Sequence, residues 1–181
     1  MATPNEKLAE SLDVLKALQD EGRRVFQSGD LSRVHRERLV ANGFLQEVMK
    51  GWLISSGPGA RSGDSTPWYV SFWEFCARYC SERFGGEWFL SAEQSLGLYG
   101  ERTVIPQQIV VCSPKGTNHA IELLYGTSLY DLKVTKMPAS ADIVVKDGLR
   151  LFSPAPALVR VAESFLARNP VEAQVVLAAW A

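Results

Sequence analysis

A segment of small and turn-forming residues, GPGARSGDSTP, interrupts the chain at 57–67 and constrains its fold more than any other feature. Runs of glycine, serine and proline disfavour helices and strands, and they are typical of linkers between folded parts. The chain has 181 residues, which is enough for one large domain or two small ones. We therefore expect an α+β protein with a first domain over 1–56, a linker over 57–66 and a mixed α/β domain over 67–181.

The residues before this segment alternate between helical and strand-like patterns. Leucines recur at three- and four-residue spacing and predict a helix over 5–22. A short strand is expected at 24–28, a second helix at 32–42, and a hairpin at 44–55 whose turn contains Lys50-Gly51. Helix, strand, helix and hairpin is the order of a winged helix-turn-helix, although other small α+β units share it.

The residues after the segment predict a second core. The range 68–85 contains seven aromatic side chains and is expected to form a mostly buried helix. A strand and a short helix should follow over 88–100, and then β-like runs between 103 and 152 with a hairpin at 146–148. Two terminal helices are expected, over 154–167 and from 170 onward.

The composition is that of a cytoplasmic globular protein. The apolar share of 46% and the charged share of 22% are near the globular average, and the net charge of −1 excludes a uniformly basic, histone-like binder. An odd number of cysteines, three, is typical of reduced thiols. The first residues lack the regions of a signal peptide, and no apolar run approaches the roughly 20 residues that span a bilayer. No membrane partner is therefore expected.

Basic residues are concentrated between positions 23 and 50. Six basic and three acidic side chains give this range a net charge of +3, against −1 for the whole chain. Such a local excess suits contact with duplex DNA, because each neutralised phosphate releases counterions. The candidate DNA-binding residues are Arg33, His35, Arg36 and Lys50.

The helical repeat separates these side chains. Arg33 and Arg36 share one face of the predicted helix and are expected to reach DNA, with Lys50 at the hairpin tip on a backbone phosphate. Arg38 lies on the side opposite Arg36 and is expected to form a structural salt bridge, while His35 could take either role. The same charges also fit an ordinary solvated helix face.

The segment DLSRVHRERLVANGFLQEVMKGWLIS resembles the N-terminal winged helix of AbiEi-like antitoxins, the transcriptional regulators of type IV toxin–antitoxin systems. The likeness depends on a Leu/Arg-rich helix, on Gly43-Phe44-Leu45, and on Lys50-Gly51-Trp52 before an apolar strand. Downstream, GDSTPWYVSFWEFCARYCSERFG, WFLSAEQSLGLYG, VIPQQIVVCSPKG and ELLYGTSLYDL are similar to a subgroup in which this module precedes a Fic domain, an AMP-transferring catalytic unit.

The resemblance implies a homodimeric regulator that binds promoter repeats and represses its own operon, with a second domain that supports repression or dimer formation. It puts Arg33, Arg36 and Lys50 in contact with double-stranded DNA, and it names a cognate toxin or a fused Fic domain as a partner. The alternative is a module that docks on such a toxin or catalytic domain without binding DNA. One departure is RVFQSGDL, which is shorter than the helix that family members have before the recognition helix.

The sequence does not predict an enzyme, a cofactor or a metal site. Cys76 and Cys80 share a helix face, but a closed zinc site needs about four ligands, and only Cys112, His35 and His119 remain. His119 has no nucleophile or carboxylate at a diagnostic spacing. The Fic motif HPFxxGNGR does not occur in 1–181.

The chain ends in VEAQVVLAAWA, with an apolar Trp-Ala pair. Natural chain ends are more often polar and frayed. This ending predicts that the sequence is a piece of a longer protein, such as the N-terminal module of a Fic-type protein.

Overall fold

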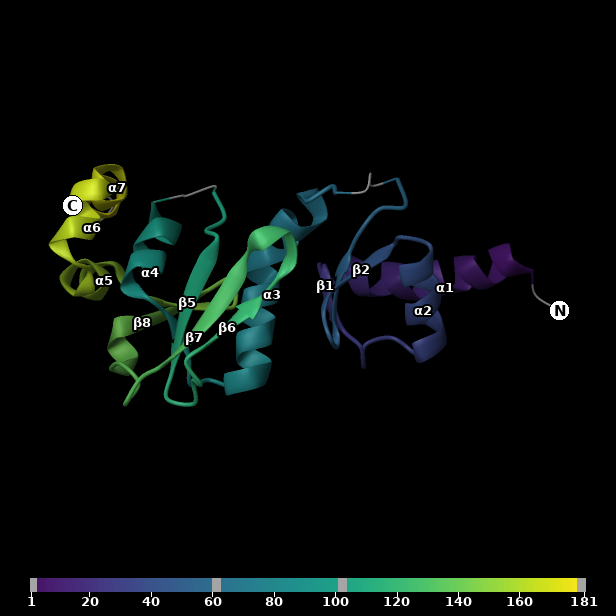
Figure 1. The fold of residues 1–181 in the computed structure, drawn as a ribbon, viewed down its shortest axis with the longest axis horizontal. Coiled ribbons are helices and arrows are strands. Elements are labelled where there is room, and N and C mark those ends of the chain that lie inside the picture. Colours follow the sequence, from purple (N-terminus) through teal and green to yellow (C-terminus); the bar gives the residue numbers. More distant parts are fainter. Residues whose placement is uncertain (1–2, 60–62, 101–103, 179–181) are drawn as a thin grey trace. The chain divides into compact units, whose positions relative to one another are not determined.

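The computed structural model describes residues 3–59, 63–100 and 104–178, and it is a mixed α+β fold, as expected from the sequence (Figure 1). The chain divides into two compact units, one up to Phe75 and one from Cys76 onward. The elements up to Phe75 are α1 Pro4–Asp20, β1 Val25–Gln27, α2 Arg33–Ala41, β2 Leu45–Met49, β3 Trp52–Ser55 and the first half of α3 Thr66–Phe84.

The second unit begins with the rest of α3. Its other elements are β4 Phe89–Leu90, α4 Ala92–Tyr99, β5 Gln108–Ser113, β6 His119–Glu122, the 3₁₀ turn η1 Leu124–Gly126, β7 Ser128–Lys133, η2 Ser140–Asp142, β8 Ile143–Lys146, β9 Leu149–Phe152, α5 Pro154–Arg160, α6 Glu163–Arg168 and α7 Pro170–Ala178. The strands and the first helices thus lie close to where hydrophobic spacing predicts them.

The first unit is built on a three-stranded antiparallel sheet in the order β1-β3-β2. Side chains alternate between its faces, as the pleat of a strand requires. Phe26 and Leu53 enter a core with residues of α1, α2, β2 and the turn before α2, namely Leu15, Leu39, Leu45 and Leu31. This apolar core packs both helices onto the sheet.

The first half of α3 also belongs to this unit. The Trp52 and Phe75 rings meet edge to face with their centroids 5.7 Å apart, and Trp68 lies 5.4 Å from Phe75 in the same way. The Glu74 carboxylate accepts hydrogen bonds from the backbone N–H groups of Arg24 and Val25. The division between the units therefore falls within α3, after the segment 57–66, of which 60–62 lie outside the described residues.

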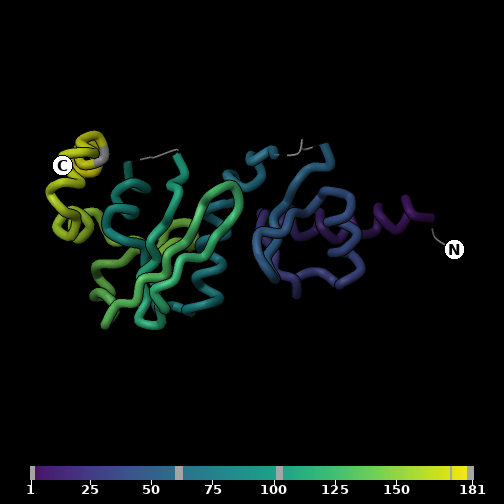
Figure 2. Tube along the Cα trace, viewed as in Figure 1, coloured from purple at the N-terminus to yellow at the C-terminus, as the bar shows by residue number. Residues whose placement is uncertain are grey.

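The second unit contains a four-stranded sheet in the order β4-β5-β7-β6, in which only the central pair, β5 and β7, is parallel. Cys112 of β5 packs in a core with Leu96 of α4, Phe152 of β9 and Ala157 of α5. Its neighbour Val111, which points to the other face, is also fully buried. Figure 2 shows these strands as adjacent green and teal tubes.

The helix expected over 154–167 is divided. Val161 and Ala162 have extended backbone angles between α5 and α6. Val161 is buried in the same core as Ala157. A continuous helix would also place Val161 at an apolar position, so hydrophobic spacing does not reveal the break. The apolar Trp-Ala ending lies outside the described residues. Among the described helices, none has both the length and the apolar character needed to cross a bilayer.

Candidate nucleic-acid interface

Local signals at both ends fix the position of α2. The Ser32 hydroxyl accepts a hydrogen bond from the backbone N–H of His35 at 3.3 Å, so it caps the start of the helix. At the other end Gly43 has a φ of +77°, a left-handed conformation that glycine adopts without strain. The chain can therefore turn directly from α2 into β2.

One face of α2 is held against α1 by polar contacts. Arg38 Nη1 donates to the carbonyl oxygen of Lys7 at 2.5 Å and to Ser11 Oγ at 2.7 Å. His35 Nδ1 lies 2.9 Å from the same Ser11 Oγ. Arg38 thus has the structural role that we expected, although its partners are neutral oxygens rather than a carboxylate. His35 lies on this α1 side, and we leave it out of the proposed interface.

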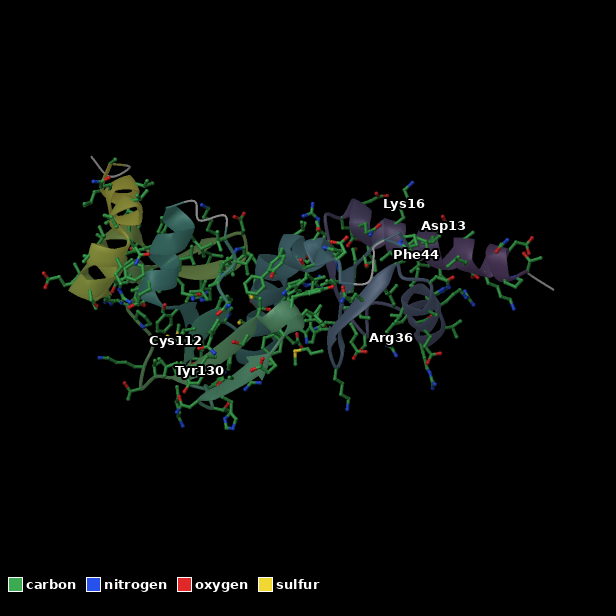
Figure 3. The ribbon with its side chains drawn as sticks, turned by 45° about the horizontal axis from the view of Figure 1, so that its top comes forward. Asp13, Lys16, Arg36, Phe44, Cys112 and Tyr130 are labelled. Carbon is green, nitrogen blue, oxygen red and sulfur yellow. The ribbon has the colours of Figure 1, made fainter. Side chains whose placement is uncertain are left out.

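A groove of about 550 Å³ separates α2 from the β2–β3 hairpin. Its lining consists of residues from α2, the hairpin and the turn after β1, namely Ser28, Arg36, Glu37, Val40, Ala41, Glu47, Lys50, Gly51 and Leu53. Arg36 Nη1 donates to the backbone carbonyl of Ser28 at 2.8 Å, and Figure 3 labels this arginine between α2 and the hairpin. The groove brings together the candidates Arg36 and Lys50.

Lys50 is exposed at the tip of the hairpin, and it makes no ion pair with any residue in the described ranges. Gly51, with a φ of +87°, supplies the left-handed conformation of the turn. The ammonium group of Lys50 is therefore available to a ligand.

Arg33 projects into solvent from the first turn of α2. Its Nε donates to Glu37 Oε1 at 2.7 Å, and the two side chains are 81% and 60% exposed. This hydrogen bond and the charge of the Glu37 carboxylate raise the pKa of the Arg33 guanidinium. The pair lies on the helix surface beside the groove.

Sequence reasoning did not assign a role to the acidic residues of this region. Glu37 and Glu47 both line the groove, so its cationic side chains are interspersed with carboxylates. The four-residue spacing of Arg33 and Glu37 would have predicted their ion pair, because such residues are neighbours on a helix surface. The position of Glu47 depends on strand register, which the local sequence does not determine.

A second polar cluster, around the fully buried Asp131 of β7, has a different character. Its carboxylate accepts from the backbone N–H groups of Thr117 and His119, from the Thr117 hydroxyl, and from Arg83 Nη2 at 2.6 Å. Burial raises the pKa of Asp131, but the hydrogen bonds from His119 and Thr117 and the charge of Arg83 outweigh it and hold the pKa below its ordinary value. A Cβ on Gly116 would lie 2.8 Å from the backbone of β7, so this loop packs tightly on the strand.

The remaining candidates for chemistry are either buried or hydrogen-bonded to the backbone. All cysteines are buried free thiols, and burial raises the pKa of Cys112 to about 11. His119 Nδ1 lies 2.9 Å from the carbonyl oxygen of Thr117. Within 3–59, 63–100 and 104–178, no group of three or more His, Cys, Asp or Glu residues could hold a metal ion.

No protein-family model matches the chain, and no similar sequence was found among curated proteins.

Proposed function

We propose that this protein is a DNA-binding transcriptional regulator of the antitoxin type, and that residues 3–56 act as a reduced winged helix. In this proposal α2 is the recognition helix and the β2–β3 hairpin is the wing. The element order α1-β1-α2-β2-β3 and the antiparallel sheet β1-β3-β2 support it. A turn at residues 28–32 takes the place of the additional helix of larger winged helices.

The observation that supports this proposal most is the groove shared by Arg36 and Lys50. These side chains come from separate elements, α2 and the wing tip, and both line the same groove. Basic side chains that converge in this way suit the phosphates beside a DNA groove, which position a protein on the duplex without reading sequence.

The family resemblance supports the remaining parts of the proposal. The ligand is double-stranded DNA carrying promoter repeats, and the protein is a cytoplasmic homodimer, because repeated half-sites suit two-fold symmetric proteins. The unit from Cys76 onward contacts the cognate toxin or a fused Fic domain. The chain itself performs no catalysis and uses no cofactor.

One observation favours a second function, docking on a protein without binding DNA. Val34 and Val40 are exposed on α2, where they could meet an apolar partner surface. Protein docking of this kind depends weakly on salt, whereas DNA binding through phosphates depends on it steeply. Salt dependence therefore separates the two functions.

The test is a titration of a fluorescent mixed-sequence duplex of about 20–30 base pairs with the full chain, between about 50 and 200 mM salt. We expect Lys50→Ala to weaken binding about tenfold and to lower the slope of log affinity against log salt by about 0.9, because one phosphate contact is lost. Arg36→Ala should act in the same direction. Salt-independent binding, or none, would contradict the proposal.

Lys146→Ala is the matched control. Lys146 precedes Asp147-Gly148 at the exposed tip of the other hairpin, as Lys50 precedes Gly51 in the wing. The two substitutions remove the same charge from similar turns. Equal losses of affinity would indicate a general charge effect rather than binding by the wing.

A further inference from the structure

The outer face of α2 presents a particular set of side chains to solvent. Leu39 is buried, and His35 and Arg38 contact α1. The exposed side chains are Arg33, Val34, Glu37, Val40 and Ala41. The centre of this face is thus occupied by an arginine, a glutamate and small apolar groups, and not by a row of cations.

The Arg33–Glu37 pair has free hydrogen-bonding capacity. The hydrogen bond from Arg33 Nε to Glu37 Oε1 uses one donor and one acceptor. The terminal Nη1 and Nη2 groups of Arg33 and the Oε2 atom of Glu37 make no hydrogen bond with a described residue. The pair therefore offers two adjacent donor groups beside one acceptor.

The major-groove edge of a G·C base pair has the complementary order. Guanine offers two acceptors, N7 and O6, and cytosine follows with the donor amino group N4. We infer that Arg33 and Glu37 together read one G·C base pair, Arg33 through guanine N7 and O6 and Glu37 through cytosine N4. This inference rests on the proposed function, and it assigns sequence specificity to these residues.

An A·T pair does not match. Its adenine N6 is a donor that would face the arginine donors, and its thymine O4 is an acceptor that would face the carboxylate. The glutamate also repels every phosphate, so it lowers affinity for all sequences. A carboxylate at the centre of the exposed face of a DNA-binding helix is explained if it distinguishes one base pair from the others.

The experiment is selection of duplexes by the full chain from a pool in which about 20 central base pairs are randomised, with sequencing of the bound fraction. We expect the wild-type protein to prefer G·C at one position of each half-site roughly tenfold over A·T, the discrimination that a bidentate contact provides. In Arg33→Ala this preference should be lost at that position only, and in Glu37→Gln it should be weaker there, because a neutral amide oxygen accepts less strongly than a carboxylate from cytosine N4. The total amount of pool retained should rise for Glu37→Gln, because a negative charge is removed.

Glu47→Gln is the matched control, because Glu47 lines the same groove from the wing and loses the same charge. It should raise retention of the pool while leaving the G·C preference unchanged. Retention of DNA by the wild type without a G·C preference would overturn the inference alone. So would a preference that Arg33→Ala leaves unchanged, or one that Glu37→Gln does not weaken. No retention of the pool even at low salt would overturn the proposed function and the inference together.

Discussion

Two of the arginine–carboxylate pairs in the described residues have similar lengths and opposite environments. Arg33 Nε lies 2.7 Å from Glu37 Oε1 on the surface of α2, and the two side chains are 81% and 60% exposed. Arg83 Nη2 lies 2.6 Å from Asp131 Oδ2, and the arginine side chain is 33% exposed whereas the aspartate is fully buried. The same chemistry is thus placed once in water and once in the interior of a unit.

The difference shows that burial, rather than distance, decides what such a pair does. Exposed pairs contribute little to stability, because water solvates both partners when they separate. A buried carboxylate must instead have its charge and lone pairs satisfied, and Asp131 has four donor groups around it. The Arg33–Glu37 pair is therefore free to act on a ligand, whereas the Arg83–Asp131 pair holds the fold.

The largest effect that would test this comparison is expected for Asp131→Ala. The substitution leaves the Arg83 charge and the N–H groups of Thr117 and His119 without their acceptor, so we expect a loss of about 3 kcal/mol in the free energy of unfolding. Urea denaturation measures it. Asp131→Asn keeps the shape of the side chain and one oxygen at this position and should lose less. A loss in Asp131→Ala with none in Asp131→Asn would point to a cavity effect instead.

A smaller effect on the free energy of unfolding is expected when the pH is lowered. The pKa of Asp131 is lowered in the folded protein from its ordinary value of 3.8. A lowered pKa means that the unfolded chain binds the proton first, so the stabilisation is present above about pH 4 and is lost as the pH falls through the folded pKa. The difference in unfolding free energy between wild type and Asp131→Asn should therefore shrink as the pH is lowered below this value.

The comparison of wild type with Asp131→Asn also controls for other carboxylates that take up protons in acid. Glu6 and Asp64 also have lowered pKa values, because they accept hydrogen bonds from Thr3 and Thr66, respectively, at helix starts. Their contributions are common to both proteins and cancel in the difference. A difference that stays constant down to the lowest pH would show that the charge of Asp131 does not stabilise the fold.

The smallest effect is expected for Arg33→Ala. Its urea midpoint should equal that of the wild type within error, because the guanidinium and its partner are both in water. Arg83→Ala makes the same chemical change and should lower the midpoint clearly, since it removes the cation beside a buried carboxylate. Equal midpoints for the two variants would contradict the distinction between the pairs.

Local elements could be predicted because their signals lie within a few residues. The spacing of leucines in α1, the cap at Ser32 and the turn at Lys50-Gly51 each depend on neighbours in the chain. The candidates Arg36 and Lys50 were found in the same way, because a charge cluster and a hairpin tip are visible in the sequence.

The features that the sequence did not predict have a common cause. The rings of Trp52 and Phe75 join α3 to the sheet of the first unit, and burial of Val161 accompanies the division of the expected helix over 154–167. His35 meets Ser11 of α1 instead of facing outward. Each of these outcomes depends on a partner distant in the chain or on core packing, which hydrophobic spacing does not identify.

Hydrophobic period, glycine turns and helix caps already specify most helices and strands of this protein, since they follow from backbone geometry over a few residues. The parallel pairing of β5 with β7, the boundary within α3 and the exposure of each arginine depend on the folded chain. Pairing and burial join residues far apart in sequence, so they are fixed only when the elements pack together.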